Sequence, residues 1–512
     1  MQQERKKSIV RFRRAWRALQ ASVLCAMVAG CTVGPKYIPP AMTAPPAFKE
    51  LPAQFNGAEG WTVAQPQDAV LRGKWWEIYN DSELSTLEEQ LNIDNQNIRQ
   101  AFENFMEARA LAREARAQYF PTVSVGGSYT RARASSNTAS TGGDGITSGK
   151  QSQVFALPAG ASWEPDLWGK VRNTVHASQY AAQLSGADLE NVRLTEQATL
   201  AEFFFEIRGQ DALQVLLDST VDADKKALEI AQTRYDTGVD DQISVVEAQT
   251  TLESAQSAAI NIGVERAQFE HAIAMLTGKP ASTFSIPVKP RTSEPPPIPL
   301  GVPSQLLERR PDIAAAERGM AAANAQIGVA YAAFYPALTL SASGGVESSA
   351  IKNLLDWPSR FWSVGPSISE TVYDGGLRRA TVNQYIATYN ADLAGYRQTV
   401  LMAFQQVEDS LAAVRILAQQ IRRQQEAVDS AQKSVTLELG RYQMGIDPYI
   451  DVVTAQTTLL SNQELLTSLK VQEMTDSVQL IEALGGGWDR SQLPTPAQVT
   501  QKPSRTDTTI QH

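Results

Sequence analysis

Residues 234–238, RYDTG, return 207 residues later as RYQMG at 441–445. A second pair of segments, EAQT at 247–250 and TAQT at 454–457, keeps the same separation. Two matches at one separation indicate that the halves of the chain are copies of one unit, and a repeat has to be recognised before a fold is assigned. In each copy the glycine follows a stretch typical of helix, which predicts a tight turn between two helices.

The repeat extends toward the N-terminus of each half. YFP at 119–121 matches FYP at 334–336, and each follows an Ala-rich helical stretch. DLWG at 166–169 corresponds to YDGG at 373–376, where the chain returns to helix. Each half therefore reads as helix, two strands, long helix, tight turn and helix.

The helices predicted before the turns are too long for a globular core. No proline occurs between Pro165 and Pro280 or between Pro366 and Pro448, so helix can continue without interruption. The seventy residues 166–235 would reach about 100 Å as one helix. Apolar residues at helical spacing predict that such helices pack side by side. An intramolecular coiled coil would show the same periodicity and stays open at this point.

Four short segments alternate apolar with polar or small residues, the period of a sheet with two different faces. Their apolar positions are Val123, Val125 and Tyr129, then Phe155, Leu157, Ala159, Ala161 and Trp163, then Leu338, Leu340 and Ala342, and finally Trp362, Val364 and Ile368. A lipid-facing exterior and a wet lumen fit this alternation, and a small soluble sheet is the alternative. Four strands cannot close a membrane barrel, which needs about eight, so membranous strands require oligomerisation.

The N-terminus reads as an export signal. Seven basic residues within the first seventeen precede an apolar run at 18–30, which is shorter than the roughly 20 residues of a membrane-spanning helix. VAGC at 28–31 then looks like a lipoprotein cleavage site, which would leave Cys31 with S-diacylglycerol and N-palmitoyl groups. An ordinary cleavage site beside an incidental cysteine is the alternative. Several acyl chains together anchor a protein stably.

The composition points away from nucleic acids and enzymatic chemistry. The formal net charge is −9, and removal of the leader, with seven basic residues and one acid, makes it about −15, which disfavours a nucleic-acid partner. The three histidines form no cluster with cysteines, so a metal site or a cysteine nucleophile lacks ligands. No phosphate-binding loop occurs. We expect no enzyme, and no cofactor beyond the lipid on Cys31.

The combined motifs resemble a known family. They are CTVGPKY at 31–37, the pair Trp75-Trp76, ERRPDI at 308–313 and the two RYxxG turns. Together they span the mature chain and resemble the TolC-type outer-membrane factors, especially the lipoprotein branch that serves resistance-nodulation-division (RND) efflux pumps. The resemblance implies a mainly α protein with β-strands, in which three chains close one twelve-stranded barrel above a periplasmic α-helical barrel.

The same resemblance implies the function and the partners. The protein would be the outer-membrane exit duct of a tripartite pump that exports drugs or other small toxic compounds. A homotrimer would bind a periplasmic membrane-fusion adaptor and an inner-membrane RND transporter, and Cys31 would hold it in outer-membrane lipid. A duct for type I protein secretion is the alternative, against which the lipid-anchor motif and the ERRPDI segment argue.

By the same resemblance, the two RYxxG turns would form the periplasmic tip and close the pore at rest. The gate candidates are Tyr235, Asp240, Asp241, Arg441, Tyr442, Asp447 and Asp451. Asp451 matches an acidic aperture position of the family, whereas Ser244 and Thr454 depart from it. The acids could instead solvate the helix ends, and the tyrosines, together with Arg234 and Arg441, could serve interhelical packing. Acidic rings around a narrow axis would favour cations.

The expected organisation of the chain follows from these segments. It comprises a signal peptide at 1–30, a lipid-anchored Pro-rich segment at 31–75, a first repeat at 76–284, a Pro-rich linker at 285–303, a second repeat at 304–487 and a polar C-terminal tail at 488–512.

Overall fold

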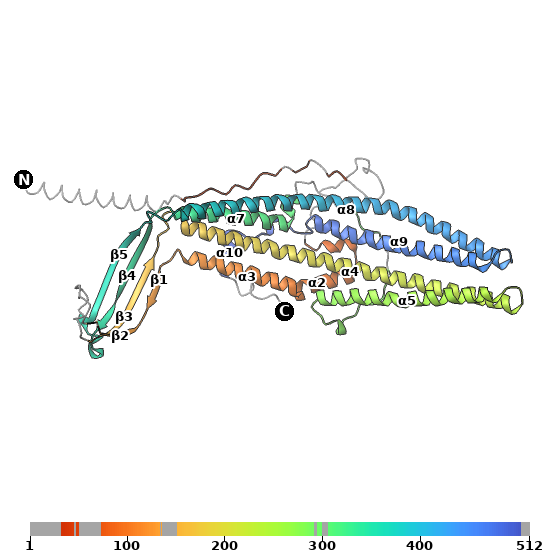
Figure 1. Cartoon of the computed structure of the whole chain (residues 1–512), viewed down its shortest axis with the longest axis horizontal. Coiled ribbons are helices and arrows are strands. Elements are labelled where there is room, and N and C mark those ends of the chain that lie inside the picture. The colour runs from red at the N-terminus through yellow and green to blue at the C-terminus, as the bar shows by residue number, and fades with distance from the viewer. Residues whose placement is uncertain are drawn as a thin grey trace, which may run out of the picture.

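The structure is a computed structural model of the chain. It describes residues 32–42, 44–45, 48–50, 73–133, 135, 151–290, 294–298 and 306–502. Figure 1 shows an elongated molecule with a sheet at one end and two helical hairpins at the other. Among the described helices, none combines the length and the apolar character needed to cross a membrane.

The main helices come in three pairs of equal length. They are α3 (Gln96–Ala117) and α7 (Pro311–Ala332) with 22 residues each, α4 (Lys170–Asp236) and α8 (Leu377–Gln443) with 67, and α5 (Gln242–Leu276) and α9 (Tyr449–Ala483) with 35. The predicted pair of repeats is confirmed. A helix of 67 residues is about 100 Å long, as expected from the proline-free stretches.

The remaining helical elements are short and lie outside these pairs. They are η2 (Trp75–Tyr79), α2 (Ser82–Asp94), η3 (Ala281–Thr283), α6 (Leu306–Arg309), η5 (Ile351–Asn353), η6 (Trp357–Ser359), η7 (Arg490–Gln492) and α10 (Pro496–Val499). Trp75 and Leu84 pack against Phe204 and Ile207 of α4 in the main hydrophobic core. Val499 is fully buried, so the described part of the tail, up to residue 502, packs on the helices.

One antiparallel sheet contains five strand segments. They are β1 (Thr122–Val125), β2 (Ser128–Arg133), β3 (Gln151–Trp163), β4 (Ala337–Ser348) and β5 (Arg360–Ser369). Both β1 and β2 pair with β3, β3 pairs with β4, and β4 pairs with β5. The register of β1 continues into β2, because Val125 pairs with Ala159 and Ser128 with Ala156. The chain therefore contributes four strands, as predicted, and the first is interrupted opposite Pro158, which has no amide hydrogen.

The register gathers the predicted apolar positions on one face of the sheet. Val123 pairs with Ala161, Ala161 with Ala342, and Ala342 with Val364. This face is largely uncovered in the single chain, with Val364 73% exposed and Trp362 81% exposed. An exposed apolar face this extensive is unusual for a protein in water and suits contact with lipid.

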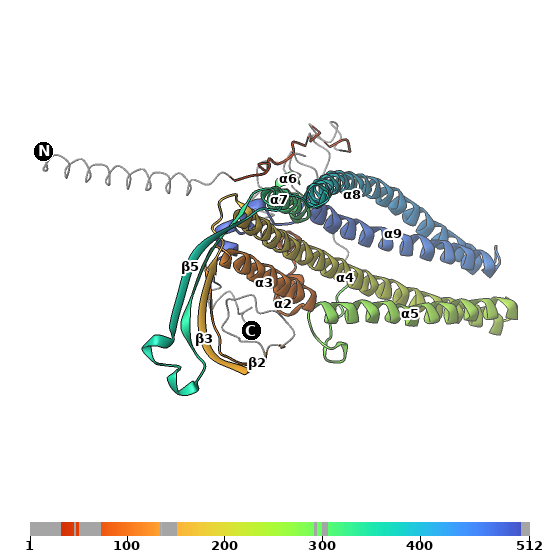
Figure 2. The ribbon, with the colours of Figure 1, turned by 60° about the vertical axis from the view of Figure 1, so that its left-hand side comes forward.

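The helices line up side by side in one curved layer (Figure 2). Next to the sheet α4 packs between α3 and α7, and α7 also packs on α8; toward the tips α4 packs between α5 and α9, and α9 on α8. The layer has two free edges, one formed by α3 and α5 and the other by α8. The strand order gives the sheet matching edges, with β1 and β2 on one side and β5 on the other.

The helices of 22 and 35 residues meet end to end halfway along the molecule, α3 with α5 and α7 with α9. The side-chain amide of Asn95, at the start of α3, donates to the carbonyl of Leu276, the last residue of α5, at 3.0 Å. The guanidinium of Arg310, at the start of α7, donates to the carbonyl of Ala483, the last residue of α9, at 2.9 Å. Each junction thus joins a helix next to the sheet, α3 or α7, to a helix of the tip hairpins, α5 or α9.

Candidate functional site

The two hairpin tips are built from the same backbone turn. Gly238 and Gly445 adopt left-handed φ values of +72° and +74°, which glycine tolerates best. Both turns form the same backbone hydrogen bond: the Val239 amide donates to the Arg234 carbonyl at 2.9 Å, and the Ile446 amide donates to the Arg441 carbonyl at 3.0 Å. This pattern closes the C-terminus of a helix.

Each turn carries an arginine-aspartate pair six residues apart. The Arg234 Nε and Asp240 Oδ2 atoms are 3.3 Å apart, and Arg441 Nη2 donates to Asp447 Oδ1 at 2.9 Å. The Arg441 guanidinium holds the pKa of Asp447 below its ordinary value. For Asp240, burial favours the neutral acid, but the polar groups around the carboxylate outweigh burial, and the pKa is lowered. Both aspartates are therefore charged at neutral pH.

The repeat symmetry breaks at the tyrosines. Tyr235 is 41% exposed, whereas its counterpart Tyr442 is 1% exposed. The Arg234 guanidinium lies 4.7 Å from the centre of the Tyr442 ring, and Tyr449 meets the same ring edge-on at 5.1 Å. Arg234 also donates to the backbone carbonyl of Gln443 at 3.1 Å. One arginine of the first hairpin is thus fixed on the second hairpin and joins the two tips.

Burial and the neighbouring Asp240 carboxylate raise the pKa of Tyr442 to about 12. Tyr442 therefore keeps its proton throughout the physiological range. A cation-π contact of this kind contributes about 0.5–2 kcal/mol, and more where water is excluded.

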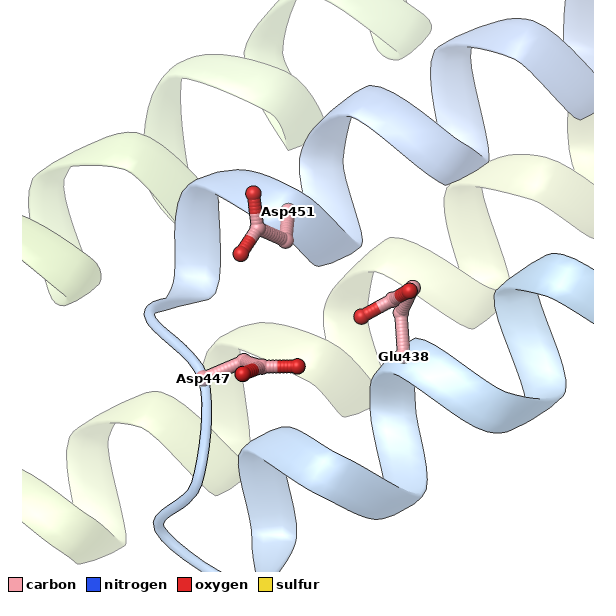
Figure 3. Close-up of side chains that lie close together, drawn as sticks. All are labelled: Glu438, Asp447 and Asp451. Atoms are coloured by element: carbon pink, nitrogen blue, oxygen red, sulfur yellow. The ribbon is translucent and has the colours of Figure 1, made fainter.

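Three carboxylates gather beside the second turn (Figure 3). Glu438 of α8, Asp447 of the turn and Asp451 of α9 can each place an oxygen within 4.8 Å of the others. Arg441 pairs with Asp447 and approaches Glu438 to 4.0 Å, so it neutralises part of this charge. Asp451 is exposed in the first turn of α9. The tip of the second repeat consequently presents a cluster of acidic groups whose charge Arg441 compensates only in part.

All seven predicted gate residues lie on the two tips, but they do not form one cluster. Asp240 lies beside Tyr442, while Arg441, Asp447 and Asp451 lie together on the second tip. Asp241 caps α5 by accepting from the Ile243 amide at 3.0 Å, and the Tyr235 side chain is exposed. Neither Tyr449 nor Glu438 was predicted from the sequence. Tyr449 follows Pro448 at the start of α9, a position that carries no motif of its own.

The turns also expose apolar side chains. Val239 and Ile243 of the first hairpin are 63% and 64% exposed, and Met444 and Ile446 of the second are 70% and 60% exposed. Contiguous exposed apolar groups mark contact surfaces in many proteins. The tips thus combine the contact of Arg234 with the second hairpin and a set of exposed apolar side chains.

The segment after Cys31 is fixed at the boundary between sheet and helices. The Val33 amide donates to the Trp168 carbonyl at 3.1 Å, and the Asn173 side chain donates to the Val33 carbonyl at 3.2 Å. Asn324 donates to the Pro35 carbonyl at 3.0 Å. Cys31 itself, like the signal peptide at 1–30, lies outside the described residues, but its neighbour Thr32 lies against Gly169 at the start of α4.

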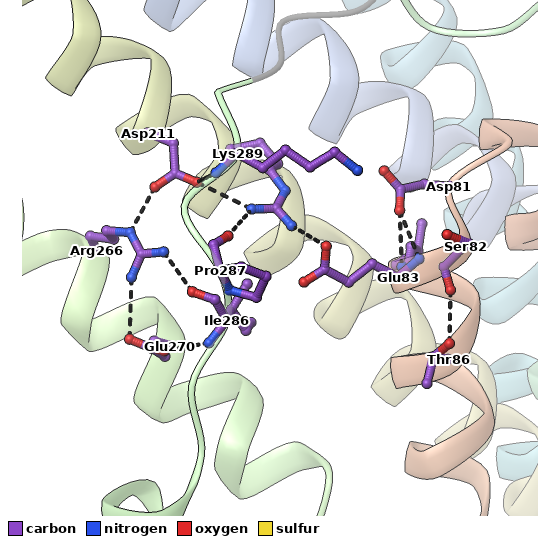
Figure 4. Close-up of polar contacts among 12 residues, drawn as sticks. Asp81, Ser82, Glu83, Thr86, Asp211, Arg266, Glu270, Ile286, Pro287 and Lys289 are labelled. Carbon is purple, nitrogen blue, oxygen red and sulfur yellow. Dashed lines mark hydrogen bonds and ion pairs between the residues drawn. The ribbon is translucent and has the colours of Figure 1, made fainter.

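A buried charge network lies at mid-length (Figure 4). Asp211 of α4 is fully buried and accepts from Arg208 Nη1 at 3.1 Å, Arg266 Nε at 2.7 Å and the Lys289 amide at 2.8 Å. Arg208 also donates to Glu83 of α2 at 2.7 Å. The network joins α2, α4, α5 and the first residues of the linker. Three donors on one carboxylate make its burial tolerable.

The chain matches known proteins over most of its length. Residues 87–279 and 302–486 match the family described as Outer membrane efflux protein. The protein is 30% identical over 480 residues to TtgC of Pseudomonas putida, a probable efflux pump outer membrane protein, with 92% of this chain and 95% of TtgC covered. The outer-membrane channel OprN has a TM-score of 0.80 at 26% identity, covering 90% of this chain and all of OprN. The Campylobacter jejuni channel CmeC shares the fold, with a TM-score of 0.82 at 21% identity, 91% of this chain and 97% of CmeC covered.

These findings define the class of the protein as an outer-membrane channel of the TolC-like fold, which extends into the periplasm. The chain belongs to the outer membrane efflux protein family. Members of this family are ducts of efflux pumps and not enzymes, so the expectation of a non-enzymatic protein is confirmed.

Proposed function

We propose that the protein is the trimeric exit duct of a tripartite RND-type efflux pump that exports drugs or other small toxic compounds. The observation that carries the proposal is the agreement between the two layers of the molecule. The sheet is open at β1/β2 and at β5, and the helical layer is open on the same two sides, at α3/α5 and at α8. Identical copies joined edge to edge would close both layers at once.

The proposed assembly accounts for the exposed apolar face of the sheet. Three chains of four strands make a barrel of twelve, whose apolar face would contact lipid and whose serine-rich face would line the lumen. The helices below would form a tube that continues the lumen through the periplasm. Such a duct conducts passively, and its partners would supply the energy.

The tips are the proposed gate. Arg234 and Tyr442 would hold the hairpins of one chain together in the closed state, and Arg441 with Asp447 would stiffen the second turn. Asp240, Asp241, Asp447 and Asp451 would make the entrance acidic, and Tyr235 would face a neighbouring chain. Opening would then require the contact of Arg234 with the second hairpin to break.

The proposed partners are a periplasmic membrane-fusion adaptor and an inner-membrane RND transporter. The exposed Val239, Ile243, Met444 and Ile446 give the adaptor an apolar surface at the tip. At the other end, the docking of Val33 on Trp168 supports a lipid anchor, because it would bring acylated Cys31 to the membrane surface.

The test is drug susceptibility and dye efflux in cells that lack the protein, complemented with the wild type or with Cys31→Ser. The proposal predicts that the wild type restores efflux and forms a heat-resistant trimer in outer-membrane fractions. Palmitate labelling of the wild type, but not of Cys31→Ser, tests the anchor. A folded trimer whose loss leaves susceptibility unchanged but abolishes export of a protein would instead identify a type I secretion duct.

A further inference from the structure

The two β-hairpins of the chain pair in equivalent registers. Thr122 pairs with Ser162 in the first hairpin, and Ala337 pairs with Ser369 in the second. The first strand of each hairpin is therefore related to its copy by 215 residues, and the second strand by 207. The separation of 215 also relates the YFP and FYP segments before the strands, and 207 relates the tip turns after them.

The pairing of β3 with β4 joins the first repeat to the second. In it, Pro158 lies opposite Gly345, and Gly160 lies opposite Ser343. A ring made of equivalent units uses one kind of contact at every joint. The joint between the second repeat of one copy and the first repeat of the next copy should therefore reproduce the joint that the chain already contains.

We propose that β5 of one copy pairs antiparallel with β1/β2 of the next in the register obtained by carrying the β3–β4 pairing forward. Pro158 in the second strand of the first hairpin corresponds to Gly365, 207 residues later, and Gly345 in the first strand of the second hairpin corresponds to Thr130, 215 residues earlier. The pair Pro158–Gly345 therefore becomes Gly365 opposite Thr130 of the next copy. The same step places Ser367 opposite Ser128 of the next copy. This inference rests on the proposed trimer, and it adds the register in which the barrel closes.

The proposed register keeps the two faces of the sheet distinct around the whole ring. From Val123 the pairings lead to Ala161, Ala342 and Val364, and then to Arg131 of the next copy, eight residues beyond Val123. Because eight is an even number, apolar positions stay on one face at the new joint. A slip by one residue would exchange the faces.

The pairs chosen for a test should be close enough for a disulfide. Pro158 accepts a hydrogen bond from the Gly126 amide at 2.9 Å, so its carbonyl points to β1. Its pair with Gly345 is then of the non-hydrogen-bonded kind, in which Cα atoms are about 4.5 Å apart. Gly365 with Thr130, and Ser367 with Ser128, inherit this geometry on the serine-rich face. A Cβ at Gly365 meets open space in the single chain.

The experiment uses four double-cysteine variants of the full chain. Gly365→Cys with Thr130→Cys and Ser367→Cys with Ser128→Cys are in register, whereas Gly365→Cys with Ser128→Cys and Ser367→Cys with Thr130→Cys are displaced by two residues. Every substitution thus occurs once in each class. Membranes are oxidised with copper phenanthroline and analysed on non-reducing gels. As a positive control for oxidation, Ser343→Cys with Ser363→Cys should close within one chain, because the two serine Oγ atoms lie 3.1 Å apart.

The in-register pairs should give covalent dimers and trimers, and the displaced pairs about a tenth as much or less, since cross-strand diagonals exceed disulfide reach. Cross-links in the displaced pairs alone would overturn the register and leave the trimer intact. Native trimers that form no cross-link in any variant would also overturn the proposed edge pairing. Absence of native trimers in the wild type would instead refute the assembly on which the proposed function depends.

Discussion

Asn95 and Arg310 occupy equivalent positions in the two repeats and donate the same hydrogen bond from different side chains. Asn95 lies at the start of α3 and donates to the last carbonyl of α5 at 3.0 Å, and Arg310 lies at the start of α7 and donates to the last carbonyl of α9 at 2.9 Å. Asn95 also caps its own helix by accepting from the Asn97 and Ile98 amides. The repeats have therefore kept a junction while its chemistry changed.

The same junctions predict that replacing either of two glycines destabilises the protein. Gly278 and Gly485 have φ values of +70° and +93°, and an added Cβ would lie 2.6 Å from the Asp94 carbonyl oxygen and 2.2 Å from that of Arg309. Gly278→Ala and Gly485→Ala should each lower the free energy of unfolding by about 1–3 kcal/mol or more. Urea denaturation followed by circular dichroism measures the effect. Gly263→Ala, inside α5 with open space around it, is the control and should be neutral or stabilising.

Arg234 should control the gate more strongly than Arg441. Arg234 contacts the Tyr442 ring and the Gln443 carbonyl on the other hairpin, whereas Arg441 pairs with Asp447 on its own turn. Arg234→Ala and Tyr442→Ala should therefore raise single-channel conductance in planar bilayers, and Arg441→Ala should raise it less. Arg423→Ala, at a largely exposed arginine that pairs with Glu426 of the same helix α8, serves as the control. Equal conductance for the wild type, Arg234→Ala and Tyr442→Ala would contradict the proposed gate.

Asp224 should make the stability of the helices near the tips depend on pH. This aspartate of α4 is 3% exposed, and burial raises its pKa from 3.8 to about 6. The folded state then binds more protons than the unfolded state between these values, so stability falls as pH rises through this window and levels off above it. Asp224→Asn should raise the melting temperature at pH 7.5 and change it much less at pH 4.5. An equal shift at both pH values, or the same pattern in the exposed control Asp222→Asn, would argue against this origin.

The mid-length network should be among the most sensitive places in the helical layer. Asp211→Asn would remove the buried negative charge that Arg208, itself 2% exposed, and Arg266 share, and would leave Arg208 paired with Glu83 alone. Breaking a buried ion pair in this way costs about 3–5 kcal/mol. Thermal unfolding in detergent checks the value against Asp218→Asn, an exposed position two turns further along α4. A loss no larger than in that control would show that the network contributes little.

The architecture could be predicted because its signals are local and occur twice. The RYxxG segments place both turns, the proline-free stretches give the helix lengths, and the alternation at Val123 and Val364 identifies the apolar face of the sheet. The interruption between β1 and β2 was not predicted, since it depends on Pro158 in the opposing strand.

The details of the tips could not be predicted, because equal sequence motifs there have unequal surroundings. Tyr235 and Tyr442 follow the same arginine in the same turn, yet one is exposed and the other buried. What separates them is the surroundings of the second turn, where Tyr442 meets Arg234 from the first hairpin and Tyr449 from its own hairpin. Asp211 likewise looks like an ordinary helix acid until residues 55 and 78 positions away, Arg266 and Lys289, converge on it.

The equal lengths of α4 and α8 restrict how such a chain can change in evolution. An insertion of seven residues lengthens a helix by about 10 Å and nearly preserves its faces, whereas one inserted residue turns everything beyond it by about 100°. A seven-residue insertion in α4 alone would carry Arg234 past Tyr442 and leave the two hairpins at different heights. Longer or shorter relatives of this protein should therefore differ from it by matched insertions or deletions in both halves, so the duplicated gene can change the reach of the tube only in paired steps.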